Sequence, residues 1–251
     1  MQKSFDLTGK VAIVTGGYRG LGRGMAIGLA KAGADVALVD REPATETAGV
    51  IQSMGRKALT LTADLMSIEP IPSLVQKTIE AFGKIDILIN NAGTIRRTPA
   101  IDYSEKDWDD IMAVNAKTVF FFSQAVARDM LKRKAGKIIS IASLLSFQGG
   151  ILVPAYSASK GAVAQITKAL ANEWASQGIN VNAIAPGYMA TDNTKALRAD
   201  AARAKAILER IPAGRWGTPE DLADVAVFLA SPASDYVNGH VLVVDGGWMA
   251  R

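Results

Sequence analysis

The sequence predicts a doubly wound α/β fold, in which one parallel sheet is covered by helices on both faces. Short runs rich in Val, Ile and Ala alternate with longer amphipathic segments along the whole chain. The short runs are apolar at nearly every position, as expected of strands that are buried on both faces. A glycine-rich turn at 16–22 separates the first run from the first helical segment. We therefore expect a single domain over 1–251.

Seven strands and several helices follow from this alternation. The expected strands are 10–17, 34–40, 58–64, 85–93, 136–143, 178–187 and 240–247. The expected helices include 23–33, 108–133, 155–177 and 221–231. The segment 188–218 is polar, has helical propensity and follows the sixth strand. Because ligands of such sheets bind beyond the carboxyl ends of the strands, we expect this segment to form a small helical lid.

Composition excludes several classes of function. The chain has no Cys, which rules out disulfides, thiolate nucleophiles and Cys-ligated zinc. Its single histidine, His240, lies at the start of the last strand and gives no support to a Ser-His-Asp hydrolase. The net charge is +4, but the basic residues are scattered apart from 131–137, so nucleic-acid binding is not expected. No apolar run approaches the roughly 18 residues of a membrane span, and we expect a cytoplasmic protein.

The turn at 16–22 has the pattern of a dinucleotide-binding loop, as in a Rossmann fold. Its glycines permit close approach to a pyrophosphate, and the helix that follows offers free N–H groups. Asp40 ends the second strand, where a carboxylate can accept hydrogen bonds from both hydroxyls of a ribose. This favours NAD. Arg19 and Arg41 could meet the 2′-phosphate of NADP or only face solvent, so NADP remains the second choice.

Tyr156 and Lys160 are spaced to lie on one face of a helix. A phenol with its usual pKa of about 10 is a poor base near neutral pH, and a nearby ammonium should lower that pKa. We therefore predict that this pair transfers a proton while a hydride moves to or from a nicotinamide.

Five motifs occur in the order and spacing of the short-chain dehydrogenases/reductases. They are TGGYRGLG at 15–22, NNAG at 90–93, Ser143, YSASK at 156–160 and PG at 186–187. The chain resembles this family over essentially its whole length. The resemblance implies a nicotinamide-dependent oxidoreductase of alcohols or ketones that needs no metal. It also implies a homotetramer that pairs through the helical segments 108–133 and 155–177.

The resemblance assigns roles to individual residues. The implied catalytic residues are Asn115 in a proton relay through water, Ser143 on the substrate oxygen, Tyr156 as acid or base, and Lys160, which also binds a ribose. Asp64 is expected near the adenine, 91–93 along the ribose, and 186–187 with Thr191 near the carboxamide. The full set of expected cofactor contacts is Gly16, Arg19, Gly20, Leu21, Gly22, Asp40, Asp64, Asn91, Ala92, Gly93, Tyr156, Lys160, Pro186, Gly187 and Thr191.

Five stretches resemble members of the family that act on deoxy sugar acids during bacterial breakdown of pectin and uronates. They are 90–112, 141–160, 172–194, 211–222 and 244–251. A sugar acid needs a cation for its carboxylate and polar partners for its hydroxyls. Arg96, Arg97 and Gln148 are the candidates, although one or both arginines could simply face solvent. The alternatives are a gluconate 5-dehydrogenase or another polyol reductase, an acyl-carrier ketoreductase, and a dinucleotide-binding protein without turnover.

Overall fold

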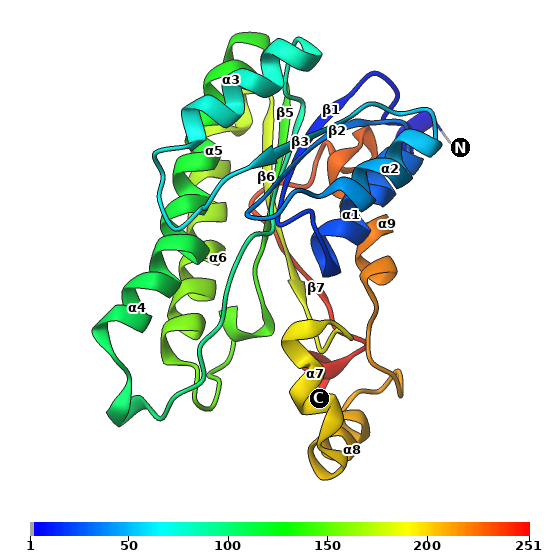
Figure 1. Ribbon diagram of the computed structural model, residues 1–251. Coiled ribbons are helices and arrows are strands. Elements are labelled where there is room, and N and C mark those ends of the chain that lie inside the picture. Colours follow the sequence, from blue (N-terminus) through cyan, green and yellow to red (C-terminus); the bar gives the residue numbers. More distant parts are fainter. Residues whose placement is uncertain (1–2) are drawn as a thin grey trace.

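The computed structural model describes residues 3–251 and contains one sheet of seven parallel strands (Figure 1). The strand order is β3-β2-β1-β4-β5-β6-β7, which confirms the doubly wound fold. Each strand is shorter at one or both ends than the sequence predicts, because the predicted ranges include flanking loop residues, such as Gly16 and 91–93, that lie outside the strands. The strands are β1 (Val11–Thr15), β2 (Asp35–Asp40), β3 (Ala58–Thr62), β4 (Ile87–Asn90), β5 (Gly136–Ile141), β6 (Ile179–Pro186) and β7 (Val241–Val244).

Helices cover both faces of the sheet, with α1, α2 and α9 on one side and α3, α5 and α6 on the other (Figure 1). Two of them, α2 and α3, were not expected from the sequence. Prolines open α3, where the missing N–H costs nothing, but in the sequence they obscure the helical pattern. The bounds are α1 (Gly20–Lys31), α2 (Thr45–Ser53), α3 (Ile71–Phe82), α4 (Glu105–Met112), α5 (Thr118–Arg133), α6 (Pro154–Trp174), α7 (Lys195–Ala199), α8 (Ala201–Arg210) and α9 (Pro219–Ala230).

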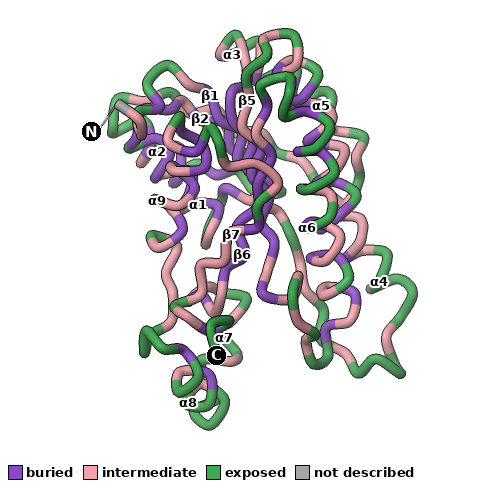
Figure 2. Tube along the Cα trace, turned by 180° about the vertical axis from the view of Figure 1, so that it is seen from behind, coloured by how far each residue is buried: buried purple, intermediate pink, exposed green. Residues whose placement is uncertain are grey.

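The apolar core consists of one layer on each side of the sheet. Neighbouring residues of a strand point to opposite faces, so Ile13 packs with the α5 side and Val14 with the α1 side. The largest fully buried side chains include Phe122 of α5 on one side and Leu29 of α1 on the other. Figure 2 shows that the central strands are buried along most of their length, whereas the edge strands β3 and β7 are mostly half-buried. This rigid sheet fixes where its carboxyl ends present their loops.

The segment 188–218 forms α7 and α8 beyond the carboxyl ends of β6 and β7 (Figure 1). Ile207 and Ile211 are buried against Leu144 and Trp248, which attaches the segment to the loop after β5 and to the C-terminal turn. That this segment covers a ligand site remains a prediction. Among residues 3–251, no helix combines the length and the apolar character needed to cross a membrane.

Candidate active site

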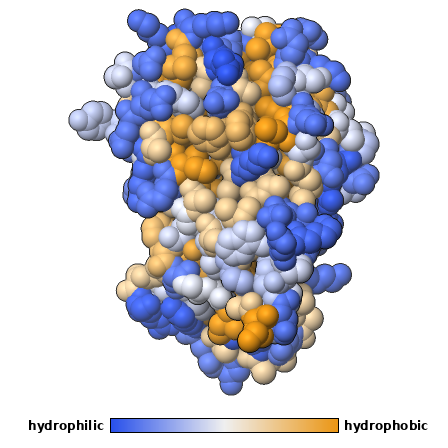
Figure 3. Space-filling view, turned by 90° about the vertical axis from the view of Figure 1, so that its left-hand side faces the viewer, coloured by the Kyte–Doolittle hydropathy of each residue, from blue (hydrophilic) through white to orange (hydrophobic). Residues whose placement is uncertain are grey.

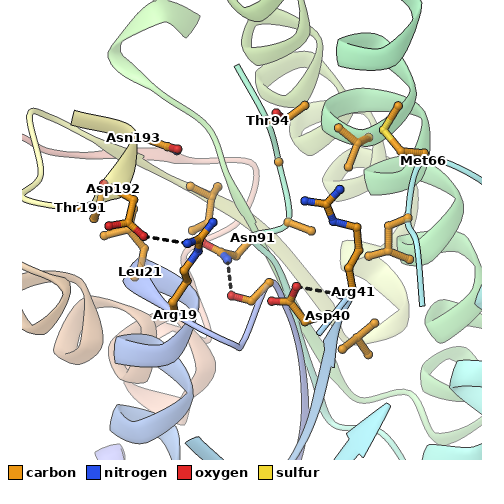
Figure 4. Close-up of a pocket in the computed structure, with 18 of the residues that line it drawn as sticks. Arg19, Leu21, Asp40, Arg41, Met66, Asn91, Thr94, Thr191, Asp192 and Asn193 are labelled. Carbon is orange, nitrogen blue, oxygen red and sulfur yellow. Dashed lines mark hydrogen bonds and ion pairs between the residues drawn. The ribbon is translucent and has the colours of Figure 1, made fainter. Parts of the chain in front are cut away.

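A pocket of about 370 Å³ lies at the carboxyl ends of β1, β2, β4 and β5 (Figure 4). The strand order reverses between β1 and β4, which is where doubly wound sheets bind their ligands. The pocket walls come from the glycine turn, the ends of β2 and β3, the loop after β4, α6 and the loop after β6. The lining residues that the sequence predicted are Gly16, Arg19, Gly20, Leu21, Asp40, Asp64, Asn91, Ala92, Gly93, Arg96, Tyr156, Lys160 and Thr191.

Other predicted residues do not line this pocket: Gly22, Arg97, Asn115, Ser143, Gln148, Pro186 and Gly187. Gly22 has a clear structural role, because a Cβ there would lie 2.0 Å from the carbonyl oxygen of Gly16. At Gly187 a Cβ would lie 2.6 Å from the Cα of Asp245, so this glycine allows the chain after β6 to pass close to the end of β7. Cofactor contacts of Pro186 and Gly187 remain predictions.

The glycine turn is shaped to receive a dinucleotide. Gly16 and Gly20 have φ values of +70° and +58°, which L side chains rarely adopt. The Asn91 side chain supports the turn from behind, because its Nδ2 donates to the carbonyl oxygens of Thr15 (2.9 Å) and Gly16 (3.2 Å). In the described chain no side chain caps the start of α1. The first N–H groups of this helix therefore suit a pyrophosphate.

Asp40 is fixed at the edge of the pocket by two backbone donors. Its carboxylate accepts hydrogen bonds from the N–H groups of Tyr18 (3.0 Å) and Arg41 (2.8 Å). A carboxylate can accept about four hydrogen bonds, so two remain for ribose hydroxyls. Arg19 has a partner that the sequence did not indicate, since its Nη1 lies 3.0 Å from the carboxylate of Asp192. Figure 4 shows this ion pair on one side of Asp40 and the Arg41 side chain on the other.

The predicted helix 108–133 is interrupted at the site. After α4 ends at Met112, residues Ala113–Lys117 form a π-turn before α5 begins. This wider turn carries Asn115, which is fully buried. The Asn115 side chain donates to the carbonyl of Thr94 and accepts from its N–H, both at 2.9 Å, and also donates to the hydroxyl of Ser159 at 3.1 Å. Asn115 thus joins the loop after β4 to α6, and π-turns frequently occur at functional sites.

Tyr156 and Lys160 lie in the first turns of α6, as predicted. The Lys160 side chain is buried, its Nζ lies 5.5 Å from the centre of the Tyr156 ring, and it donates to the carbonyl of Ile141. Burial lowers the pKa of Lys160 to about 8. Burial also raises the pKa of Tyr156, against the opposing effects of a hydrogen bond with Ser143 and the charge of Arg97. The expectation of a lowered Tyr156 pKa is therefore wrong for this state, because desolvation of the phenolate outweighs the hydrogen bond with Ser143 and the charge of Arg97.

Ser143 is held beside Tyr156 by a short chain of hydrogen bonds. Its Oγ accepts from the N–H of Leu145 at 3.2 Å, and its own N–H donates to the hydroxyl of Ser146 at 3.3 Å. The Ser146 hydroxyl in turn donates to the carbonyl of Lys160 at 2.7 Å. These bonds join the loop after β5 to α6, so the relative position of Ser143 and Tyr156 is fixed before any ligand binds.

A family model described as enoyl-(acyl carrier protein) reductase matches residues 16–249. The 2-dehydro-3-deoxy-D-gluconate 5-dehydrogenase of Dickeya dadantii is 61% identical over 99% of this chain and 98% of its own length. The chain belongs to the short-chain dehydrogenase/reductase family. This membership accounts for the order and spacing of the five motifs, three of which contribute residues to the pocket.

Solved structures of short-chain dehydrogenases/reductases superpose closely on the chain. A protein of Agrobacterium tumefaciens, provisionally named 2-deoxy-D-gluconate 3-dehydrogenase and holding NADP, is 55% identical with a TM-score of 0.93 over 100% of both chains. A gluconate 5-dehydrogenase of Burkholderia cenocepacia, in complex with NADP and tartrate, is 41% identical with a TM-score of 0.94 over 99% of this chain and 98% of its own. Both relatives therefore share the arrangement of sheet and helices described above.

The two candidate arginines of this short-chain dehydrogenase/reductase have different environments. Arg96 donates to the Thr94 hydroxyl at 3.0 Å, and its Nε lies 3.6 Å from the carboxylate of Asp107. Arg97 donates to the carbonyl of Asn193 at 3.2 Å, and its charge acts on Tyr156. Of these two arginines, only Arg97 bonds to the segment after β6. Gln148 lies just beyond the short helix Leu144–Ser146, with its backbone N–H bonded to Leu144.

Several pocket residues were not predicted from the sequence. Thr94 and Asp192 directly follow Gly93 and Thr191, so their proximity to the motifs was an available signal. Met66 and Ile141 also line the pocket, and no pattern in the sequence marks them. Throughout residues 3–251, no three His, Asp or Glu side chains form a group that could hold a metal ion.

Proposed function

We propose that this short-chain dehydrogenase/reductase interconverts a ketone and a secondary alcohol on a deoxy sugar acid. The proposed substrate pair is 2-dehydro-3-deoxy-D-gluconate and its 2,5-diketo form. The observation that carries the proposal is the position of Arg97. Its positive charge acts to lower the pKa of Tyr156, and its guanidinium donates to the carbonyl of Asn193 in the segment after β6. A cation on that side of the acid–base residue suits a substrate with a carboxylate at some distance from its reacting carbonyl. The name of the Dickeya dadantii relative supports the same substrate.

Tyr156 acts in this proposal as the proton donor for ketone reduction. Bound NADH supplies the hydride in that direction and bound NAD accepts it in the reverse one. Since burial raises the pKa of Tyr156, its phenol is protonated at neutral pH and can donate to the carbonyl oxygen. The hydroxyl of Ser143 holds the same oxygen in place. Oxidation requires the phenolate and is therefore favoured at higher pH.

Lys160 and Asn115 support this proton transfer. Lys160, with its pKa lowered to about 8, still carries a charge at neutral pH. With the cofactor bound, its ammonium would bind the ribose next to the nicotinamide and would stabilise the phenolate that Tyr156 becomes after donating its proton. Asn115, which already bonds both backbone groups of Thr94, holds a water through which the proton is replaced.

NAD is the proposed cofactor. The fixed carboxylate of Asp40 accepts hydrogen bonds from the adenosine ribose and repels a 2′-phosphate. Asp64 would lie near the adenine, 91–93 along the ribose, and 186–187 with Thr191 near the carboxamide. NADP is a second choice, because Arg19 and Arg41 line the same pocket. The Agrobacterium tumefaciens relative holds NADP, which supports keeping that choice open.

The quaternary structure is proposed to be a homotetramer of single-domain subunits, with 188–218 as the lid of each site. An apolar hollow on the outward face of α4, α5 and α6 supports packing against another copy. It is bordered by Met112, Phe120, Phe121 and Ile166. Figure 3 shows apolar surface on this side of the molecule. Symmetric oligomers bury the same patch on both partners.

The deciding experiment follows NADH and NADPH absorbance with four substrates. They are the 2,5-diketo-3-deoxyhexonate, 2-keto-3-deoxygluconate in the oxidative direction, 5-ketogluconate and an acetoacetyl thioester. We expect rapid NADH oxidation with the first or NAD reduction with the second. Turnover of the thioester alone would place the chain with the acyl-carrier ketoreductases, and no turnover of any would favour a dinucleotide-binding protein without catalysis.

A second candidate function is that of a gluconate 5-dehydrogenase. It is favoured by the Burkholderia cenocepacia relative, whose structure contains tartrate, a hydroxy acid. The same Arg97 would serve either substrate, since both carry a carboxylate. Turnover of 5-ketogluconate without turnover of the deoxy compounds would select this candidate.

A further inference from the structure

Arg19 and Asp192 form an ion pair between opposite walls of the pocket (Figure 4). Arg19 belongs to the glycine turn that precedes α1, and Asp192 begins the short helical turn Asp192–Thr194 in the segment after β6. Their side chains are 69% and 65% exposed, and the contact is 3.0 Å long. Such an exposed pair is weak enough for a more highly charged partner of Arg19 to displace it.

The two arginines on either side of Asp40 differ in their availability. Among residues 3–251 Arg41 makes no ion pair, whereas the guanidinium of Arg19 is held by Asp192. Both line the pocket together with Asp40. A 2′-phosphate on the adenosine ribose would lie at Asp40 and would need cationic partners to offset the repulsion by that carboxylate. In the observed arrangement only Arg41 is free to act as such a partner.

We infer that Asp192 strengthens the preference for NAD over NADP by holding Arg19 away from the 2′-phosphate. This inference rests on the proposed position of the adenosine ribose at Asp40. Asp192 acts through Arg19 and is therefore a positioning residue. Because Asp192 belongs to the segment 188–218, the choice of cofactor depends on where this segment lies as well as on Asp40.

The test compares the dissociation constants of NADH and NADPH, measured by nucleotide fluorescence, for the wild type and Asp192→Asn. Releasing Arg19 should tighten NADPH about two- to fivefold, the range expected for one exposed ion pair, and leave NADH within error. The tightening of NADPH binding should be smaller at high salt, because salt screens the charge of Arg19. Glu209→Gln is the matched control, since it removes one negative charge from α8 at a site where the carboxylate lies 3.8 Å from Lys205. Both constants should be unchanged in this control.

A second pair of variants separates action through Arg19 from direct repulsion by Asp192. In an Arg19→Gln background, Asp192→Asn should no longer tighten NADPH. An unchanged NADPH constant in the single variant, equal tightening of NADH, or a gain that persists without Arg19 would each overturn the inference. The ratio of the two dissociation constants in the wild type tests the proposed NAD preference. The role of Asp192 is tested separately, by the change in that ratio in Asp192→Asn, whichever nucleotide the wild type prefers.

Discussion

The ammonium of Lys160 lies 5.5 Å from the centre of the Tyr156 ring, but it donates its hydrogen bond to the carbonyl of Ile141. The Lys160 side chain is 5% exposed, and within the described chain it pairs with no carboxylate. Desolvation therefore acts on this ammonium almost without compensation and lowers its pKa to about 8. A buried, unpaired lysine destabilises the fold, so its presence in α6 points to a catalytic benefit.

Replacing Lys160 by Met should stabilise the cofactor-free protein while abolishing turnover. The change in pKa from 10.5 to about 8 corresponds to roughly 3 kcal/mol of free energy of unfolding at neutral pH. Below pH 8 the lysine is charged in both the folded and unfolded states, so the full difference between variant and wild type should be observed. Between pH 8 and 10.5 only the unfolded state holds the proton, so wild-type stability rises relative to the variant and the difference shrinks.

Urea denaturation of Lys160→Met and wild type at pH 7 and near pH 10 measures this difference. Lys168→Met is the matched control, because Lys168 is an exposed lysine on the same helix. Its free energy of unfolding should change by less than about 0.5 kcal/mol. A Lys160 variant that is less stable than wild type at pH 7 would show that the hydrogen bond to Ile141 outweighs the desolvation.

Replacing Tyr156 by Phe should abolish turnover and leave NADH binding largely intact. The change removes the proton and the hydroxyl that bonds with Ser143, but keeps the ring that packs beside Lys160. Steady-state turnover and a fluorescence titration with NADH measure the two properties separately. Loss of NADH binding together with activity would contradict the assignment of Tyr156 as the acid–base residue.

The sequence predicted the sheet and the pocket well because both depend on local patterns. Apolar runs located all seven strands, and the glycine turn with Asp40 located the pocket beside β1 and β2. The π-turn around Asn115 could not be predicted, since it leaves no mark on the hydropathy of α4 and α5. The ion pair of Arg19 with Asp192 could not be predicted either, because the two residues are far apart in the sequence and come together only in the folded chain.

The pKa of Tyr156 was predicted with the wrong sign for a related reason. Helical spacing brings Lys160 near the phenol, but only the folded structure shows that this ammonium bonds with Ile141 and that the phenol is desolvated. Spacing gives proximity, whereas a pKa depends on burial and on where each donor points. Burial at a pocket wall depends on segments far apart in the sequence and is not visible in a five-residue motif.

Replacing Asp40 by Ala should weaken NAD binding more than NADP binding. The variant loses the carboxylate proposed to bind the ribose, and with it the repulsion of a 2′-phosphate, whereas Arg41 remains. We expect the ratio of the two dissociation constants to move toward NADP by about tenfold, the effect of one charge-assisted hydrogen bond. Titration of the variant with both nucleotides measures this ratio. An unchanged ratio would mean that Arg19 or Arg41 alone controls the preference between NAD and NADP.

Arg97 and Arg96 should differ in their effect on catalysis although they are adjacent. Replacing Arg97 by Gln removes the cation that acts on Tyr156 and faces the proposed substrate carboxylate, so kcat/KM for the sugar acid should fall about ten- to a hundredfold. Arg96→Gln is the matched control. It breaks contacts with Thr94 and Asp107, and kcat/KM should change less than about threefold, as for other exposed pairs.

The pH dependence of oxidation separates a chemical role of Arg97 from a merely structural one. The positive charge of Arg97 lowers the pKa of Tyr156, so its removal should raise that pKa and move the alkaline rise of the oxidation rate to higher pH. Arg97→Lys keeps the charge and should restore the profile more fully than Gln does. A fall in kcat/KM without any displacement of the profile would assign Arg97 to substrate binding alone. Equal losses in Arg96→Gln and Arg97→Gln would instead show that the carboxylate lies between the two, despite the ion pair of Arg96 with Asp107.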